Sequence, residues 1–182
     1  SYIFGDVLAE VYGYARSRKV IWAGFFAMIF ATVMAQVIIT LPVNTDEPFN
    51  KVYQPAVELL FGNTWRIVIG SIIAFWVGDF ANSYILTKMK IWTEGRHLWM
   101  RTIGSTIVGQ ALDSLIFYPI AFYGIWQTSE LFKILGFNWL FKISIEVLMT
   151  PATYAVVGFL KKAEREDYYD RGTNFSPFSL RD

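Results

Sequence analysis

Residues 101–126 read RTIGSTIVGQALDSLIFYPIAFYGIW, and this stretch decides the fold. It is apolar and long enough to cross a bilayer, since a transmembrane helix needs about 20 residues. Near its middle, however, it carries Gln110, Asp113 and Ser114, and Pro119 follows within two turns. A charged group at the centre of a membrane helix costs about 2.5–3.5 kcal/mol even on the most permissive scale. The rest of the chain is therefore expected to enclose this polar segment.

The composition places the chain in the membrane. Its 182 residues are 54% hydrophobic, 18% aromatic and only 17% charged, and the mean hydropathy is +0.38. An average soluble domain has about 25% charged and about 45–50% apolar residues. The sequence therefore predicts an integral membrane protein.

Several classes of function are disfavoured by what the sequence lacks. There is no cysteine, which removes disulfides, thiolate metal sites and thiol nucleophiles. His97 is the one histidine, and no paired metal ligands or phosphate loop are visible. The net charge is +1 and no basic stripe is present, so no nucleic-acid partner is expected. We expect no metal, no cofactor and no enzymatic activity.

Hydropathy divides the chain into helical spans and a tail. One partial and four full spans are expected, at residues 1–15 (partial), 20–41, 65–88, 101–126 and 135–160. The polar tail, residues 161–182, is expected to be ordered only in part. The predicted fold is an all-α transmembrane bundle.

The linkers alternate in charge. Lys and Arg gather in residues 16–19, 88–101 and 161–165, whereas residues 43–64 and 127–133 contain few of them. Cytoplasmic loops of membrane proteins are enriched in Lys and Arg, so the first group and the C-terminus are expected in the cytoplasm. A cytoplasmic N-terminus would require one further helix before Ser1. That arrangement would be a six-helix bundle, with about five helices in this chain.

Ionisable residues fall inside the predicted spans. Asp79, Asp113 and Glu146 lie near the centres of three different spans, and Lys142 precedes Glu146 by about 6 Å along the helix axis. Four such charges facing lipid would cost on the order of 10 kcal/mol, so they should face one another or a wet cavity. They form either a buried network that fixes helix packing or a substrate or proton site. Lys142 either neutralises Glu146 or pairs with another helix.

Other features support a polar interior. Asp6 and Glu10 are four residues apart, so they share a face of the partial helix, either facing the interior or exposed near its end. Pro119 and Pro151 each free a carbonyl within a turn of an acidic residue, which either lines a cavity or marks an ordinary kink. Trp76 precedes Asp79 by one turn and would suit stacking on a flat heterocycle, or else faces lipid.

Long motifs resemble a known family. They are GDVLAEVYGYARSRKVIW at residues 5–22, FANSYILTKMKIWTEGRHLWMRTIGSTIVGQALDSLIFYPIAF at 80–122, the Lys142/Glu146 pair, and LKKAEREDYYDRGTNFSPF at 160–178. They are similar to the queuosine precursor transporters, also described as vitamin uptake transporters. The resemblance implies a six-helix, multi-pass protein of the bacterial inner membrane. It would import 7-deazaguanine precursors of the tRNA nucleoside queuosine, namely 7-cyano- or 7-aminomethyl-7-deazaguanine, or queuine.

The resemblance also carries individual residues. The positions that match family motifs are Asp6, Glu10, Arg16, Arg18, Asn82, Lys88, Arg96, Arg101, Ser105, Thr106, Gln110, Asp113, Lys142 and Glu146. A guanine-like edge presents adjacent N–H and NH2 donors, which one carboxylate can accept together. The hypothesis is that Glu146 or Asp113 does this, while Asn82 and Gln110 read the other ring groups. Phe117, Phe122 or Trp76 would stack on the ring, and a second carboxylate would suit an ammonium group.

Alternatives remain at this point. The protein could couple uptake to protons, act as a facilitator, or be a substrate-binding subunit that needs a partner ATPase. It could also carry another vitamin-like heterocycle. Outside transport, two other functions are possible from the sequence: a membrane-embedded enzyme, or a structural subunit of a larger complex. The sequence leaves open whether the chain forms a homodimer.

Overall fold

The computed structural model describes residues 2–42, 44, 46–61 and 65–179, and all of its named elements are helices. They are α1 (Tyr2–Tyr12), α2 (Tyr14–Thr40), α3 (Pro48–Phe61), α4 (Trp65–Trp92), α5 (Leu98–Phe122) and α6 (Thr128–Glu164). Four of them, α2, α4, α5 and α6, are long and apolar enough to cross a membrane. The predicted all-α membrane bundle is confirmed.

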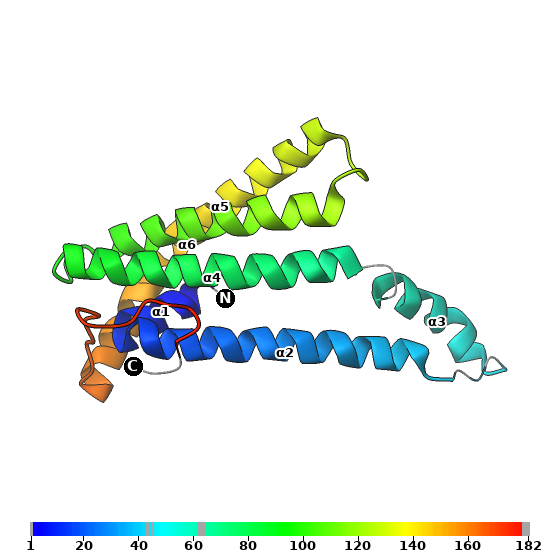
Figure 1. Ribbon diagram of the computed structural model, residues 1–182, viewed down its shortest axis with the longest axis horizontal. Helices are drawn as coiled ribbons and strands as arrows, with labels where there is room; N and C mark the ends of the chain where they lie inside the picture. Colours follow the sequence, from blue (N-terminus) through cyan, green and yellow to red (C-terminus); the bar gives the residue numbers. More distant parts are fainter. Residues whose placement is uncertain (1, 43, 45, 62–64, 180–182) are drawn as a thin grey trace.

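The bundle is built around the antiparallel pair α4 and α5. These helices run side by side, α2 lies along the other side of α4, and α6 packs against α5 (Figure 1). The short helix α1 contacts α4, α6 and α2, and α3 joins α2 to α4 at the end of the bundle away from the tail (Figure 1). The polar residues of the predicted spans therefore come from helices that meet at α1.

Glycines bring α4 and α5 into close contact. A Cβ atom on Gly109 would lie 3.0 Å from the carbonyl oxygen of Gly78 and 2.8 Å from the Cβ of Asn82. Small residues at such positions let membrane helices approach closely. The close packing at Gly109 fixes the position of Gln110 and Asp113 relative to α4.

The basic residues expected as a linker at 16–19 are helical instead. The chain breaks earlier, at Gly13, whose φ of +83° ends α1 and starts α2 at Tyr14. Asp170 of the tail accepts a hydrogen bond from the backbone N–H of Tyr14, with N···O distances of 3.0 and 3.2 Å. This contact satisfies a donor that a helix leaves free at its first turn. The helix therefore begins before the basic residues rather than after them.

Two helix boundaries at the other end also differ from the prediction. Helix α5 ends at Phe122 rather than at residue 126, because Gly124 turns the chain with a φ of +80°. Residues 128–133, expected in a loop, form the first turns of α6, where Glu130 and Lys133 pair at 2.9 Å. An acidic residue in the first turn and an i,i+3 ion pair both favour a helix. Pro151 lies inside α6 without ending it.

The tail is more ordered than expected. Residues 165–179 fold back over α1 and the start of α2 (Figure 1). Arg18 donates to the carbonyls of Asn174 and Ser176 at 2.7 and 3.0 Å, and Trp22 Nε1 donates to Pro177 at 2.9 Å. Residues 180–182 lie outside the described part. The tail is therefore part of the packed structure.

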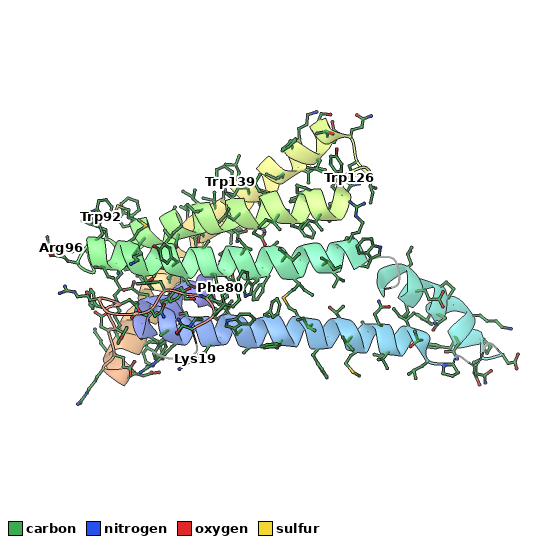
Figure 2. The ribbon with its side chains drawn as sticks, viewed as in Figure 1. Lys19, Phe80, Trp92, Arg96, Trp126 and Trp139 are labelled. Carbon is green, nitrogen blue, oxygen red and sulfur yellow. The ribbon has the colours of Figure 1, made fainter. Side chains whose placement is uncertain are left out.

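Aromatic and basic residues mark the two ends of the bundle. Trp92 and Trp126 lie at opposite ends of the α4–α5 pair, and Lys19 and Arg96 lie at the Trp92 end, near the tail (Figure 2). Both tryptophans are exposed. Tryptophans are enriched where membrane helices meet the interface. The arrangement therefore suits helices that cross a bilayer between these two levels.

Candidate functional site

A cavity of about 330 Å³ lies between α1, α4, α5 and α6. Pockets for small molecules typically measure about 300–1,000 Å³, so this one fits a small ligand. It is lined by Tyr2, Ile3, Phe75, Thr106, Gln110, Asp113, Phe141, Lys142, Ile145 and Glu146. Gln110, Asp113, Lys142 and Glu146 were predicted from the sequence, and the structure brings them together.

Lys142 pairs across the helix interface with Asp113. Its Nζ lies 2.9 Å from Asp113 Oδ2, which links α6 to α5. Of the two alternatives left by the sequence, the structure has the partner on another helix. Glu146, one turn further along α6, therefore has no ion-pair partner among the residues that the structure describes.

The wall of the cavity carries oxygen atoms that have no hydrogen-bond partner. Thr106 Oγ1, Gln110 Oε1 and Glu146 Oε1 are buried and unpaired within the described residues. Buried polar atoms nearly always have a partner, so each exception needs an explanation. A carboxylate oxygen and an amide oxygen can only accept, so Glu146 Oε1 and Gln110 Oε1 need hydrogen-bond donors. A ligand rich in N–H groups would supply them.

Asp6 and Asn82 continue this polar region behind the cavity. Asn82 Nδ2 donates to Asp6 Oδ1 at 2.5 Å, and both side chains are fully buried. Asp6 Oδ2 and Asn82 Oδ1 have no partner in the described part of the chain. Asp6 also lies close enough to Glu146 for the two carboxylates to repel each other. The unpaired acceptors therefore extend from α5 and α6 to α1 and α4.

Glu10 lies in a different, fully paired network. Arg101 binds both of its carboxylate oxygens at 2.7 Å, and Lys161 binds Oε1 at 2.6 Å. Lys90 donates to the backbone carbonyl of Glu10 at 2.5 Å and to Asp167 at 2.6 Å. Glu10 thus ties α1 to α5 and α6, and its oxygens are already occupied.

The charge of the tail residue Asp167 is stabilised by the same network. Partial burial would by itself raise the pKa of Asp167. Hydrogen bonds from Lys161 and Lys90 outweigh this effect and hold the pKa below its ordinary value. The tail is therefore attached to the bundle through an ionised carboxylate.

The three aromatic residues proposed to stack on a ligand lie elsewhere. Trp76 packs against Trp22, Phe80 and Phe178, with ring centroids 5.9, 5.1 and 5.6 Å away. Phe117 and Phe122 contact each other at 5.9 Å, and Phe122 stacks on Trp126 at 3.9 Å near the end of α5. None of the three lines the cavity.

Phe75 and Phe141 line the cavity instead, together with Tyr2. Both phenylalanines lie next to, or one turn from, a predicted site residue in the sequence. Phe141 directly precedes Lys142, and Phe75 lies one turn before Asp79. Tyr2 points its hydroxyl at the carbonyl of Gly109, 3.5 Å away, and closes the cavity from α1. No sequence pattern marked Tyr2.

Asp79 lies in a second cavity, of about 310 Å³, between α1, α2 and α4. Phe75 forms a wall of both cavities. The second cavity is lined by Phe4, Gly5, Leu8, Ser17, Val20, Ile21, Gly24, Phe75, Asp79 and Ser83. Asp79 therefore lines a different cavity from Gln110, Asp113, Lys142 and Glu146, although it lies near Asp113.

Comparison with known proteins identifies the family. Residues 1–156 match the family model described as "Putative vitamin uptake transporter". The chain belongs to this family. It is therefore a multi-pass membrane protein of a transporter family, as the motifs and the apolar helices predicted.

Two curated bacterial proteins are similar over most of the chain. A protein of Bacillus subtilis (strain 168), named "Probable queuosine precursor transporter", is 33% identical over 162 residues, which are 88% of this chain and 69% of that protein. A protein of Haemophilus influenzae with the same name is 26% identical over 161 residues, 84% of this chain and 62% of that protein. No solved structure matches. The resemblance to queuosine precursor transporters is confirmed.

Proposed function

We propose that the protein imports 7-deazaguanine precursors of queuosine across the bacterial inner membrane. The observation that carries this proposal is a set of buried oxygen atoms, on Thr106, Gln110 and Glu146, that have no hydrogen-bond partner among the described residues. They lie in a cavity that two phenylalanine rings line. A 7-deazaguanine ring is flat and carries several N–H donors. It can lie against the rings and satisfy the oxygens at the same time.

The polar groups match the edge of such a ring. Glu146 can accept the ring N–H and the adjacent NH2 group with its two carboxylate oxygens, a strong charge-assisted contact. Lys142 lies one turn earlier on the same helix and uses one of its three N–H donors on Asp113. A second donor can reach the neighbouring ring carbonyl. In this arrangement Asp113 holds Lys142 in position, and Gln110 binds the remaining ring N–H.

The charges favour one precursor over the others. Lys142 balances Asp113, whereas Glu146 and Asp6 have no ion-pair partner in the described part of the chain. A ligand that carries an ammonium group would offset this negative charge. We therefore expect 7-aminomethyl-7-deazaguanine to bind more tightly than its neutral 7-cyano counterpart.

Binding to the purified full-length protein tests the proposal. In calorimetry, Glu146→Gln should weaken binding of 7-aminomethyl-7-deazaguanine by about 10- to 100-fold, because a hydrogen bond to a charged group contributes about 1.5–3 kcal/mol. Glu130→Gln is the matched control, since Glu130 lies on the same helix but is exposed and pairs with Lys133. Unchanged binding by a folded Glu146→Gln protein would overturn the assigned site.

A further inference from the structure

The second cavity contains one carboxylate in apolar surroundings. Asp79 lies at the middle of α4, and the other walls are mostly apolar side chains from α1, α2 and α4. The substrate cavity lies on the other side of Phe75. The proposed function leaves Asp79 without a role, although an ionisable residue at this depth is costly to keep.

No cation balances Asp79 within the described residues. The described groups that face it are acidic or neutral: Asp113 from α5, Tyr2 from α1, and Ser17 from α2. Asp6 of α1 is a further acidic neighbour. Arg18, the basic residue that follows Ser17 on α2, donates hydrogen bonds to carbonyls of the tail. A carboxylate in this setting is favoured in its neutral, protonated form.

A second observation indicates that this cavity can bind a polar ligand. Ser17 is only 2% exposed, lines this cavity, and its hydroxyl has no hydrogen-bond partner in the described structure. Ser83, one turn after Asp79 on α4, lines it as well. Ser17 lies one turn from the start of α2, near the end of the bundle that carries the tail. Asp79, Ser83 and Ser17 therefore form a polar line from mid-membrane toward that end.

The ligand that Asp79, Ser17 and Ser83 fit is a proton delivered by water. Ca²⁺ takes about six to eight oxygen ligands and Mg²⁺ takes six, whereas one carboxylate and two hydroxyls are available here. No group of three or more His, Cys, Asp or Glu side chains suited to a metal is found among the described residues. One carboxylate oxygen is sufficient to hold a proton, and serine hydroxyls can pass hydrogen bonds to water.

We propose that Asp79 is a proton-binding residue that couples transport to the proton gradient, in a cavity separate from the substrate cavity. This inference rests on the proposed function. The Asp79 carboxylate takes one proton from water on one side of the membrane and returns it to water on the other, so one proton accompanies each substrate. The shared Phe75 wall places the proton site next to the substrate without making it a substrate ligand.

Transport by the purified full-length protein in lipid vesicles tests the inference. The substrate is labelled 7-cyano-7-deazaguanine, which carries no charge, with the membrane potential clamped. Under an acid-outside gradient, the wild type should accumulate substrate above equilibrium. Asp79→Asn should lose this accumulation, so that the inside/outside ratio falls to one, yet retain exchange of labelled for unlabelled substrate. Asp79→Glu should retain accumulation.

Controls make each outcome decisive. Asp46→Asn, the same change at an exposed position, should behave like the wild type. Ser17→Ala should slow proton-driven accumulation but leave the rate of substrate exchange unchanged. If Asp79→Asn does not fold, the result for Ser17→Ala tests the inference in its place. Gradient-driven accumulation by Asp79→Asn, or loss of exchange together with accumulation, would overturn the inference. A wild type that exchanges without accumulating would overturn it but leave the proposed function standing, and one that does neither would overturn both.

Discussion

Single residues differ here by their partners rather than by their type. Glu10 and Glu146 are both buried glutamates, and the sequence marked both as candidates for substrate binding. Glu10 accepts hydrogen bonds from Arg101 and Lys161 on both carboxylate oxygens. Glu146 keeps an oxygen at the cavity that no described residue binds. Sequence spacing could identify the carboxylates but not this difference, because the cations that bind Glu10 lie 91 and 151 residues away.

A difference in stability follows from these partners. Glu10→Gln should lower the free energy of unfolding by about 3–5 kcal/mol, because it leaves buried Arg101 without its carboxylate. Glu146→Gln should leave stability nearly unchanged, since no cation loses a partner. Thermal unfolding in detergent measures both variants. Equal melting temperatures for the two would contradict the distinction.

Asp167 predicts how the tail responds to acid. The pKa of Asp167 in the folded protein lies below its ordinary value of 3.8, so the unfolded chain binds the proton more readily. Its contribution to stability is therefore complete above about pH 4 and is lost as the pH falls through the lower folded pKa.

Limited proteolysis of the tail between pH 3 and pH 6 measures this response. The wild-type tail should become more susceptible below about pH 4, whereas Asp167→Asn should be susceptible at every pH in this range. Asp46→Asn serves as the control with an exposed aspartate. A wild-type tail equally protected across the range would show that the ion pairs with Lys90 and Lys161 do not hold it.

At the scale of elements, local patterns predicted the helices and long-range contacts set their ends. Apolar runs of sufficient length identified α2, α4, α5 and α6 as membrane helices. The start of α2 was mistaken because Asp170, which binds its first N–H, lies 156 residues away. The start of α6 was mistaken for a loop because its polar first turn lacks the apolar character used to find spans. Periodicity could not supply either boundary.

Because α4 and α5 pack so closely, adding one methyl group at Gly109 should lower the stability of the protein. Gly109→Ala should lower stability by about 1–3 kcal/mol, because the new Cβ would press on the Gly78 carbonyl and on Asn82, and backbone cannot yield easily. Gly136→Ala, on α6, is the control, since nothing lies within 4 Å of its Cβ position. That change should be neutral or slightly stabilising. Thermal unfolding in which Gly109→Ala matches Gly136→Ala would contradict the close approach.

At the scale of the whole molecule, composition predicted the membrane and the long motifs predicted the family. Asp113, Lys142, Gln110 and Glu146 were predicted and meet in one cavity. The phenylalanines that line the cavity were not predicted, because the apolar helices of this chain hold many aromatic side chains and only packing selects which of them face inward. The proposed cytoplasmic location of the C-terminus follows from the basic end of the bundle, which carries Lys19 and Arg96 (Figure 2).

Uptake in living cells tests the central proposal most directly. Bacteria that cannot make queuosine precursors would receive each precursor in trace amounts, and the queuosine content of their tRNA would be measured. The full-length gene and its Glu130→Gln variant should restore queuosine, whereas an empty vector and Glu146→Gln should not. The precursor that restores it at the lowest concentration should be 7-aminomethyl-7-deazaguanine. A correctly inserted protein that restores no queuosine from any precursor would contradict the proposed function.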